Sequence, residues 1–165
     1  MVETENIRVV VRVRPDEAAA EVSNACVSVR GGQSLVVGPS KASAGRPPLR
    51  ASAVQDKAKT FQFDAVFDQD ASQEEVYAAV DPLVRSTLLG YNATVFAYGS
   101  TGSGKTYTIS GPGPSPDHAG VIPRAIRQIF KIANEITERD SDALVLVHMG
   151  YVELYNNQFR DLLQK

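Results

Sequence analysis

Apolar and polar positions along the first third of the chain predict strands and turns. Residues 7–14 are dense in β-branched side chains and stop at Pro15, which cannot donate to a strand ladder, so we expect a core strand there. Residues 25–30 and 34–37 flank two adjacent glycines and predict a short hairpin. Residues 60–67 alternate apolar and polar side chains and then become apolar, as a strand that enters a core does.

A helix with both ends marked follows. Ser72 and Glu75 form a capping-box pattern at its start, and Gly90 can supply the left-handed turn that ends it. Residues 93–98 then predict a short apolar strand that leads into a glycine-rich loop and a further helix. This order of elements is typical of the α/β class, with a mostly parallel central sheet flanked by helices. The apolar face of the first helix comprises Val76, Ala79, Val80, Leu83 and Val84.

The last third of the chain predicts one more helix and one more strand. Pro123 suits an early helical position, and an apolar stripe at helical spacing follows it. Residues 143–155 are rich in β-formers and predict a strand in which His148 is packed. The Asn-Asn pair at 156–157 predicts a turn, and residues 159–163 form a short apolar tail. The stripe consists of Ile126, Ile129, Phe130, Ala133 and Ile136.

Composition narrows the class of protein. The chain has 165 residues, a formal net charge of −2, 43% hydrophobic and 22% charged residues, which fits one soluble domain over residues 1–165. The near-neutral charge argues against broad nucleic-acid binding, and no apolar run approaches the roughly 18 residues of a membrane span. A single cysteine, Cys26, and a start without a secretory signal predict a cytoplasmic location. Residues 39–56, rich in Ser, Ala and Pro, predict a flexible surface loop.

Residues 99–106 fit the phosphate-binding P-loop pattern G-x-x-x-x-G-K-[ST]. Small residues let backbone N–H groups wrap a phosphate chain, Lys105 can reach the β- and γ-phosphates, and the Thr106 hydroxyl can ligate Mg²⁺. The helix that begins near Lys105 directs its free N–H groups at the same anion. The sequence therefore predicts a site for ATP or ADP with Mg²⁺. Its nucleotide-binding residues are Gly99, Ser100, Thr101, Gly102, Ser103, Gly104, Lys105 and Thr106.

Hydrolysis of the bound nucleotide would need further groups. An acidic residue must hold Mg²⁺, and other residues must sense the γ-phosphate and place the attacking water. The single Asp-x-x-Gly pattern, at residues 117–120, follows two prolines rather than an apolar strand, so we expect a solvated loop that includes His118. No catalytic residue is therefore assigned within the chain.

Five stretches of the chain form a set in a fixed order. They are residues 7–15, 61–68, 90–111 with the P-loop, 120–124, and 151–157 with 160–163. Together they resemble the kinesin motor domain over most of the chain. The resemblance implies a microtubule-dependent ATPase whose Arg-x-Arg-Pro segment lies against adenine. Arg12, Arg14 and Pro15 would line the base, and Tyr107 would pack on its other side, while Tyr77 would lie either near the base or in the core.

The chain departs from the family in two respects. Ser100 stands where the family usually has Gln, which leaves phosphate wrapping intact, and the family's switch I and switch II segments lie beyond Lys165. We therefore expect the incomplete first half of a motor domain, without hydrolysis of its own and with a gap two strands wide between residues 93–98 and 143–155. The complete domain would bind microtubules of the cytoskeleton. Direction of movement, cargo, processivity and oligomeric state depend on other segments.

Two alternatives stay open from the residues alone. One is a nucleotide-binding module or degenerate motor that binds ATP or ADP without turnover. The other is a P-loop phosphotransferase, which would need a lid that carries arginines. The segment after Thr106 has no such basic cluster, so this second alternative is the weaker one.

Overall fold

The computed structural model describes residues 7–15, 27–38, 58–113 and 115–164. The chain divides into two compact units, residues 1–126 and residues 127–165. The flexible loop predicted at residues 39–56 falls outside the described residues, as does Cys26.

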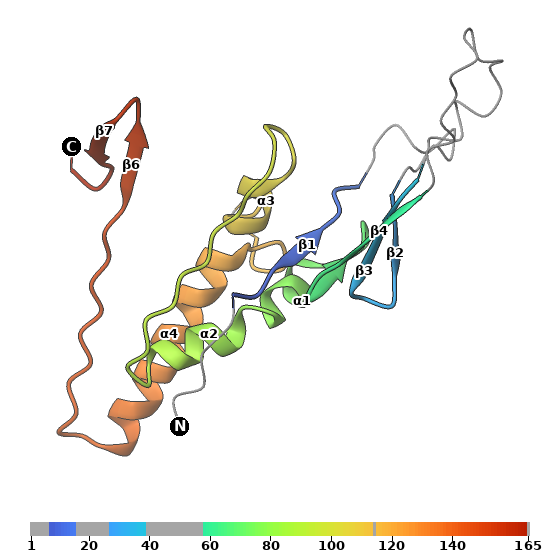
Figure 1. The fold of residues 1–165 in the computed structure, drawn as a ribbon. Helices are drawn as coiled ribbons and strands as arrows, with labels where there is room; N and C mark the ends of the chain where they lie inside the picture. Colours follow the sequence, from blue (N-terminus) through green and yellow to red (C-terminus); the bar gives the residue numbers. More distant parts are fainter. Residues whose placement is uncertain (1–6, 16–26, 39–57, 114, 165) are drawn as a thin grey trace, which may run out of the picture. The chain divides into compact units, whose positions relative to one another are not determined.

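The first unit contains one parallel strand pair, β1 (Val10–Arg12) and β5 (Ala65–Phe67) (Figure 1). Val11 lies opposite Val66, which is 5% exposed and belongs to the small core of this unit. The strand predicted over residues 7–14 is present but shorter, and it is not buried as predicted, since its apolar residues before β1 are exposed. Within the described ranges β1 pairs on one edge alone, and a buried parallel strand needs cover on both faces and both edges.

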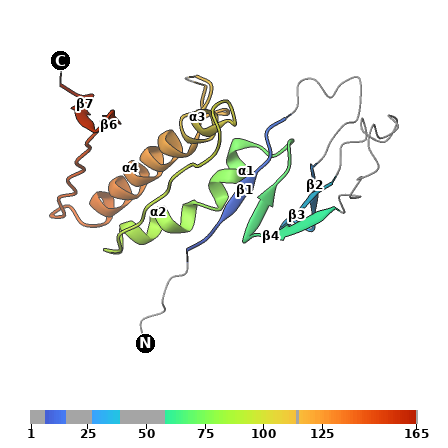
Figure 2. The same cartoon turned by 45° about the horizontal axis from the view of Figure 1, so that its top comes forward.

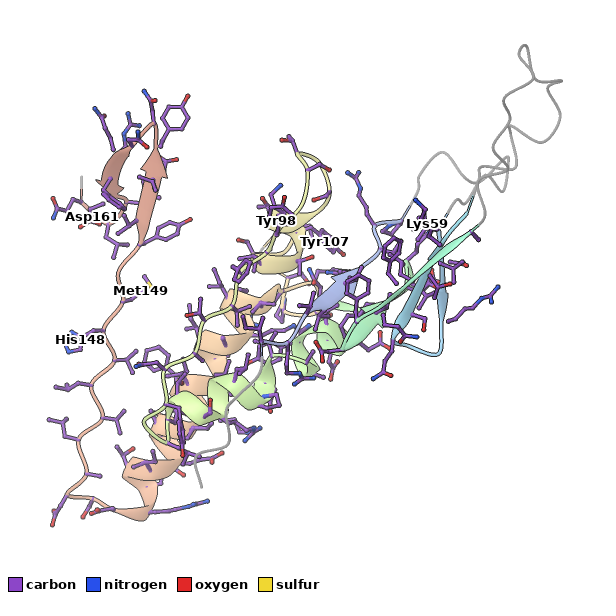
Figure 3. All side chains as sticks on the ribbon, viewed as in Figure 1. Lys59, Tyr98, Tyr107, His148, Met149 and Asp161 are labelled. Atoms are coloured by element: carbon purple, nitrogen blue, oxygen red, sulfur yellow. The ribbon has the colours of Figure 1, made fainter. Side chains whose placement is uncertain are left out.

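The first unit also contains a three-stranded antiparallel sheet. Its order is β2 (Val27–Arg30), β3 (Ser34–Val37) and β4 (Lys59–Gln62), which begins at the Lys59 marked in Figure 3. The predicted hairpin is confirmed over its described residues, and its two turn glycines both have positive φ, 60° and 70°.

The single strand predicted over residues 60–67 is wrong, because the chain bends at Phe63 and Asp64 and contributes to two different sheets. Hydrogen bonds explain the bend. The Asp64 carboxylate accepts the N–H of Val9 at 2.7 Å, and the Asp64 N–H donates to the Val9 carbonyl at 3.1 Å. Asp64 thereby ends β4 and aligns β5 with β1.

The helix predicted from Ser72 to Gly90 is present as two helices, α1 (Gln73–Ala78) and α2 (Asp81–Thr87). The capping box is confirmed: the Ser72 hydroxyl accepts the Glu75 N–H, and the Glu75 carboxylate accepts the Ser72 N–H. Pro82 explains the break, because it has no N–H to donate and its ring would clash with the carbonyl four residues earlier. Figure 2 shows α1 beside β1, which places the start of the helix against the strand.

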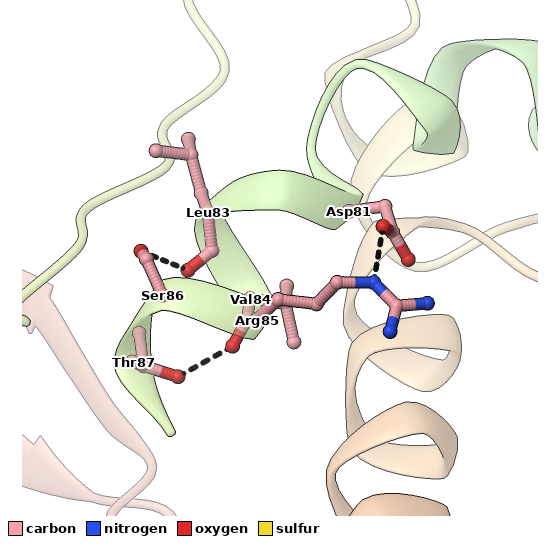
Figure 4. Close-up of polar contacts among 6 residues, drawn as sticks. All are labelled: Asp81, Leu83, Val84, Arg85, Ser86 and Thr87. Atoms are coloured by element: carbon pink, nitrogen blue, oxygen red, sulfur yellow. Dashed lines mark hydrogen bonds and ion pairs between the residues drawn. The ribbon is translucent and has the colours of Figure 1, made fainter. Parts of the chain in front are cut away.

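Side-chain contacts stabilise α2 along its length (Figure 4). Arg85 forms an exposed ion pair with Asp81 one turn earlier, at 2.7 Å. The hydroxyls of Ser86 and Thr87 donate to the carbonyls of Leu83 and Val84, both at 2.7 Å. These bonds satisfy carbonyls of the last turn, and Gly90, with φ of 94°, then redirects the chain as predicted.

Residues 91–99 run as an extended segment without strand pairing, so the strand predicted over residues 93–98 is wrong for this structure. Its side chains are exposed: Phe96 is 78% exposed and Tyr98, marked in Figure 3, is 95% exposed. The pattern of the segment is that of a strand buried on both faces. A strand of this kind forms only against hydrogen-bonding neighbours, and none of the described residues pairs with it.

The long helix α4 (Val121–Arg139) confirms the second predicted helix, with Pro123 in its first turn. The second unit continues from it into an extended segment and then a hairpin of β6 (Val152–Tyr155) and β7 (Gln158–Asp161), which includes the Asp161 marked in Figure 3. The predicted Asn-Asn turn is confirmed, since Asn156 and Asn157 have φ of 49° and 58°.

Two predictions in this unit are wrong. The strand over residues 143–155 is limited to β6, so His148 is exposed rather than packed, as is the neighbouring Met149 (Figure 3). The apolar tail at residues 159–163 is largely the strand β7, which was missed. The sequence does contain a signal for β7. Asn156 and Asn157 tolerate positive φ, and they lie between two short stretches in which apolar and polar residues alternate, a pattern that is typical of a hairpin.

Candidate nucleotide-binding site

The P-loop residues form a tight turn before a short helix, α3 (Lys105–Ile109). Gly102 and Gly104 have φ of 79° and 98°, a left-handed conformation that side chains disfavour. Gly104 is the N-cap of α3, so the free N–H groups of its first turn follow directly on the loop. The helix that was predicted to begin near Lys105 is therefore confirmed, although it has one turn and a half.

The Lys105 ammonium group lies across the loop. Its Nζ donates to the carbonyls of Gly99 and Ser100 at 2.9 and 2.8 Å. These two bonds hold the positive charge at the start of the loop rather than in solvent. A phosphate placed in the turn would meet both this charge and the backbone N–H groups.

One pocket of about 870 Å³ adjoins the loop, within the size range of small-molecule sites. Its lining includes Arg12, Arg14, Pro15 and every residue from 101 to 107. The structure thus brings the predicted base-contacting residues and the predicted phosphate-binding residues to one cavity. Gly99 and Ser100 are not in the lining, and their carbonyls contact Lys105 instead.

Arg12 and Tyr107 form one wall of this pocket. The guanidinium carbon of Arg12 lies 5.1 Å from the centroid of the Tyr107 ring, a cation–π distance. Arg12 also donates to the Thr108 hydroxyl at 3.1 Å and to the Ala71 carbonyl at 3.1 Å. Strand β1 supplies the planar charged group of Arg12, and helix α3 supplies the aromatic ring of Tyr107. The two elements are far apart in sequence, yet these side chains are in contact in the pocket wall.

Arg14 and Pro15 lie at the exposed end of the strand segment. The Arg14 guanidinium donates to the carbonyl of Gly102 at the turn of the P-loop. This contact joins the segment predicted to line the base to the loop predicted to hold the phosphates.

Gln73 is a site residue that the sequence analysis missed. It is 4% exposed, and its amide contacts Arg12, the Tyr107 carbonyl and the His118 carbonyl. The sequence offers little signal for it, because a glutamine at the first position of a helix is ordinarily solvated. Gln73 belongs to the site because the fold brings its three partners, which are distant along the chain, within hydrogen-bonding distance of its amide.

The loop before α4 contributes Asp117 and His118 to the pocket lining. The loop predicted at residues 117–120 is confirmed, and His118 is exposed as predicted although it lines the pocket, whereas Ala119 and Gly120 are buried rather than solvated. A Cβ added at Gly120 would come within 2.6 Å of the Ile109 backbone, so only glycine permits this close approach of the loop to α3. Arg124 of α4 then donates to the carbonyls of Ala119 and Asp117 at 2.8 and 2.9 Å, which fixes the loop.

Tyr77 lies outside the pocket lining, on a half-buried face of α1. Burial raises the pKa of its phenol, and the Asp81 carboxylate adds to the increase, so the hydroxyl stays protonated at neutral pH. Of the two positions open to it in the sequence, the structure favours the packed one.

Similarity to known proteins identifies the family. The kinesin motor domain family matches residues 12–165 of the chain. The chain belongs to the kinesin family. Among kinesins, it is 40% identical over 167 residues to kinesin-like protein KIF3C from Bos taurus, an alignment that covers 98% of this chain and 19% of KIF3C.

Solved kinesin structures share the fold. The crystal structure of the Drosophila kinesin family member Kin10/NOD in complex with divalent manganese and ADP has a TM-score of 0.72 and 30% identity, over 96% of this chain and 48% of the NOD chain. Drosophila NOD docked with bovine tubulin into a map of the NOD–microtubule complex has a TM-score of 0.69, with the same identity and coverage. The predicted P-loop fold of the kinesin-motor type is confirmed, and the chain spans about half the length of NOD.

The described residues contain no cluster of three or more His, Cys, Asp or Glu side chains that could hold a metal ion. No helix within the described ranges combines the length and the apolar character needed to cross a membrane.

Proposed function

We propose that the chain is the ATP-binding part of a microtubule-dependent motor ATPase of the kinesin family. The observation that carries the proposal is that Lys105 and Thr106 of the P-loop line the same pocket as Arg12 and Tyr107. Some of the lining groups have the charge and the N–H groups that a phosphate chain needs, and others are planar groups that a purine can stack on. ATP and ADP present both chemistries in one molecule.

Each predicted residue has a physical role in this proposal. The N–H groups of residues 99–106 and the Lys105 ammonium bind the phosphates, and the Thr106 hydroxyl ligates Mg²⁺. The resemblance predicts Tyr107 on the face of adenine opposite Arg12, but the Arg12 guanidinium lies 5.1 Å from the centroid of the Tyr107 ring, which leaves no room for a base between them. Arg12 and Tyr107 therefore contact adenine from the same side in this proposal, and Arg14 and Pro15 contact it beside them. The NOD structure with manganese and ADP supports a nucleotide and a divalent cation as joint ligands.

The microtubule is the proposed partner of the complete motor domain, and the cytoplasmic cytoskeleton is its proposed location. The structure of NOD docked on tubulin supports this partner. We propose that residues 1–165 bind nucleotide without hydrolysing it, because the single Asp-x-x-Gly pattern lies in a turn at the pocket edge rather than after a strand. Measurable microtubule-stimulated ATP turnover by residues 1–165 would contradict this part of the proposal.

The substitution Lys105→Ala tests phosphate binding. A ligand that binds only the folded state adds RT ln(1 + [L]/Kd) to its stability, about 2.7 kcal/mol at a ligand concentration of 100 Kd. We expect Mg·ADP and Mg·pyrophosphate to raise the melting temperature of the unmodified chain and to have no effect on the Lys105→Ala variant. The exposed Lys131 of α4 provides a matched control, and Lys131→Ala should keep the full shift. An undiminished shift in Lys105→Ala would overturn the assignment.

A further inference from the structure

The Gln73 amide is held in one orientation by three partners. Its Oε1 accepts a hydrogen bond from Nη1 of Arg12 at 2.8 Å. Its Nε2 donates to the carbonyls of Tyr107 and His118 at 2.7 and 3.3 Å. Both Nε2 partners are carbonyl oxygens, which can only accept, so the amide cannot be reversed without loss of all three bonds.

Because Gln73 is buried, losing these hydrogen bonds would be costly in free energy. Gln73 is 4% exposed and is the one buried polar side chain in the described part of the chain. A buried amide that loses its partners keeps the full cost of its desolvation, so the arrangement resists distortion. Its three partners lie in β1, in α3 and in the loop before α4. Gln73 thus connects β1, α3 and the loop before α4 by hydrogen bonds, and these three segments contribute to the pocket wall.

The same junction determines where the Arg12 guanidinium lies. Gln73, Thr108 and the Ala71 carbonyl each accept from it, and all three are neutral oxygens. The guanidinium is therefore fixed in position while its positive charge is not neutralised by these acceptors. The Tyr107 ring, whose own backbone carbonyl is bonded to Gln73, lies beneath it.

We propose that Gln73 is a positioning residue that holds Arg12 and Tyr107 ready for the base of the nucleotide. The inference rests on the proposed function and extends it to a residue outside the P-loop and the Arg-x-Arg-Pro segment. Gln73 acts through Arg12 and does not contact phosphate. It sets affinity for the nucleoside part of the ligand, because groups held in their binding geometry lose less entropy when the ligand binds.

A purely structural role for Gln73 makes a different prediction. If the amide only stabilised the fold, its loss would weaken binding of every ligand in the pocket by a similar factor. A positioning role separates the ligands, because Mg·ADP has a base and Mg·pyrophosphate does not. Two affinities measured on one variant therefore distinguish the roles.

The substitution Gln73→Met keeps the length of the side chain and removes its polar atoms. We expect the dissociation constant for Mg·ADP to rise about tenfold, the effect of one hydrogen bond to a charged group, and that for Mg·pyrophosphate to change less than about twofold. Titration calorimetry on the full chain gives both constants. The exposed Gln158 of β7 supplies the matched control, and Gln158→Met should change neither. Equal losses for both ligands in Gln73→Met would overturn the inference.

A double-mutant cycle tests whether Gln73 acts through Arg12. We expect Gln73→Met to lower Mg·ADP affinity by less than about twofold in an Arg12→Ala background, because the positioned group is then absent. Full additivity of the two losses would overturn the inference. The outcome is distinguishable from failure of the proposed function, which would appear as retained Mg·pyrophosphate binding in Lys105→Ala.

A second variant covers the case in which Gln73→Met does not fold. Thr108→Val removes another side-chain acceptor of Arg12 from a half-buried position with little change in shape. We expect it to weaken Mg·ADP by about threefold and to leave Mg·pyrophosphate unchanged, since the bond from Arg12 to Thr108, at 3.1 Å, is longer than the bond to Gln73, at 2.8 Å. An unchanged affinity for Mg·ADP, or an equal loss for both ligands, would count against the positioning of Arg12.

Discussion

The surroundings of the P-loop differ from the two extended segments, residues 91–99 and 143–151, in how well their side chains are contacted. Polar side chains are well contacted around the P-loop, whereas apolar side chains are largely uncontacted in the extended segments. Around the P-loop, polar groups such as Arg12 and Gln73 form hydrogen bonds to partners from several elements. The extended segments are rich in apolar residues, yet most of these are exposed. The polar groups of the site therefore have hydrogen-bonding partners, whereas most apolar side chains of the extended segments lack cover from the described residues.

The difference arises from the range of the interactions that each region needs. The pocket is built by helix caps, a tight loop and a few side-chain bonds, all within the first unit. A strand buried on both faces needs neighbouring strands, and its apolar side chains contribute only when something covers them. Tyr98 and Leu144, which are 95% and 80% exposed, show how much apolar surface is left without cover in these segments.

The largest expected effect comes from disrupting the close packing beneath the pocket. In Gly120→Ala the new Cβ would lie 2.6 Å from the carbonyl carbon and oxygen of Ile109, backbone atoms that cannot move away without shifting α3. We expect the free energy of unfolding to fall by about 3 kcal/mol, the upper end for an overpacked site. Chemical denaturation of the chain measures it.

Gly113 supplies the control for this substitution. It lies in the same loop, its φ is not in the left-handed region, and a Cβ added there would meet no atom within 4 Å. Gly113→Ala should leave the midpoint of denaturation unchanged or raise it slightly, because alanine reduces the freedom of the unfolded chain. Similar losses in both variants would show that the close approach at Gly120 does not matter for stability.

Much of the pocket region could be predicted because its signals are local. The capping box at Ser72, the left-handed turn at Gly90 and the P-loop followed by a helix each depend on residues within one or two turns. The missing N–H of Pro82 also indicates the break before it, whereas the apolar periodicity alone predicts one continuous helix.

The remaining features depend on contacts between distant segments. No local pattern indicates that Gln73 would be buried, since its partners are 34, 45 and 61 residues away. Likewise, the apolar run at residues 93–98 indicates the capacity to form a strand, and pairing decides whether the strand forms. The predicted gap between residues 93–98 and 143–155 stays a prediction, because the two segments belong to different compact units.

The next substitution pair compares a covered residue with an uncovered one. Val66→Ala removes two methyl groups from the parallel pair of β1 and β5, where Val66 is buried, and we expect a loss of about 2 kcal/mol in the free energy of unfolding. Phe96→Ala removes a larger side chain that is 78% exposed, and we expect less than about 0.5 kcal/mol. Denaturation midpoints of the two variants give the comparison. A larger loss for Phe96→Ala would mean that the extended segment is covered in solution.

The smallest expected effect concerns the charge that starts α1, the helix that carries Gln73. Hydrogen bonds from the Ser72 N–H and the Ser72 hydroxyl lower the pKa of the exposed Glu75 carboxyl below its ordinary value of 4.5. A group with a lowered folded-state pKa stabilises the fold above its ordinary pKa, and this contribution disappears as the pH falls through the folded-state value. In Glu75→Gln the amide still accepts from Ser72 but carries no charge, so the variant should be slightly less stable than the unmodified chain at pH 7. Denaturation at pH 7 and again well below pH 4.5 should show this small difference vanishing at the acid end. A difference that persists unchanged in acid would mean that the capping box stabilises α1 without its charge.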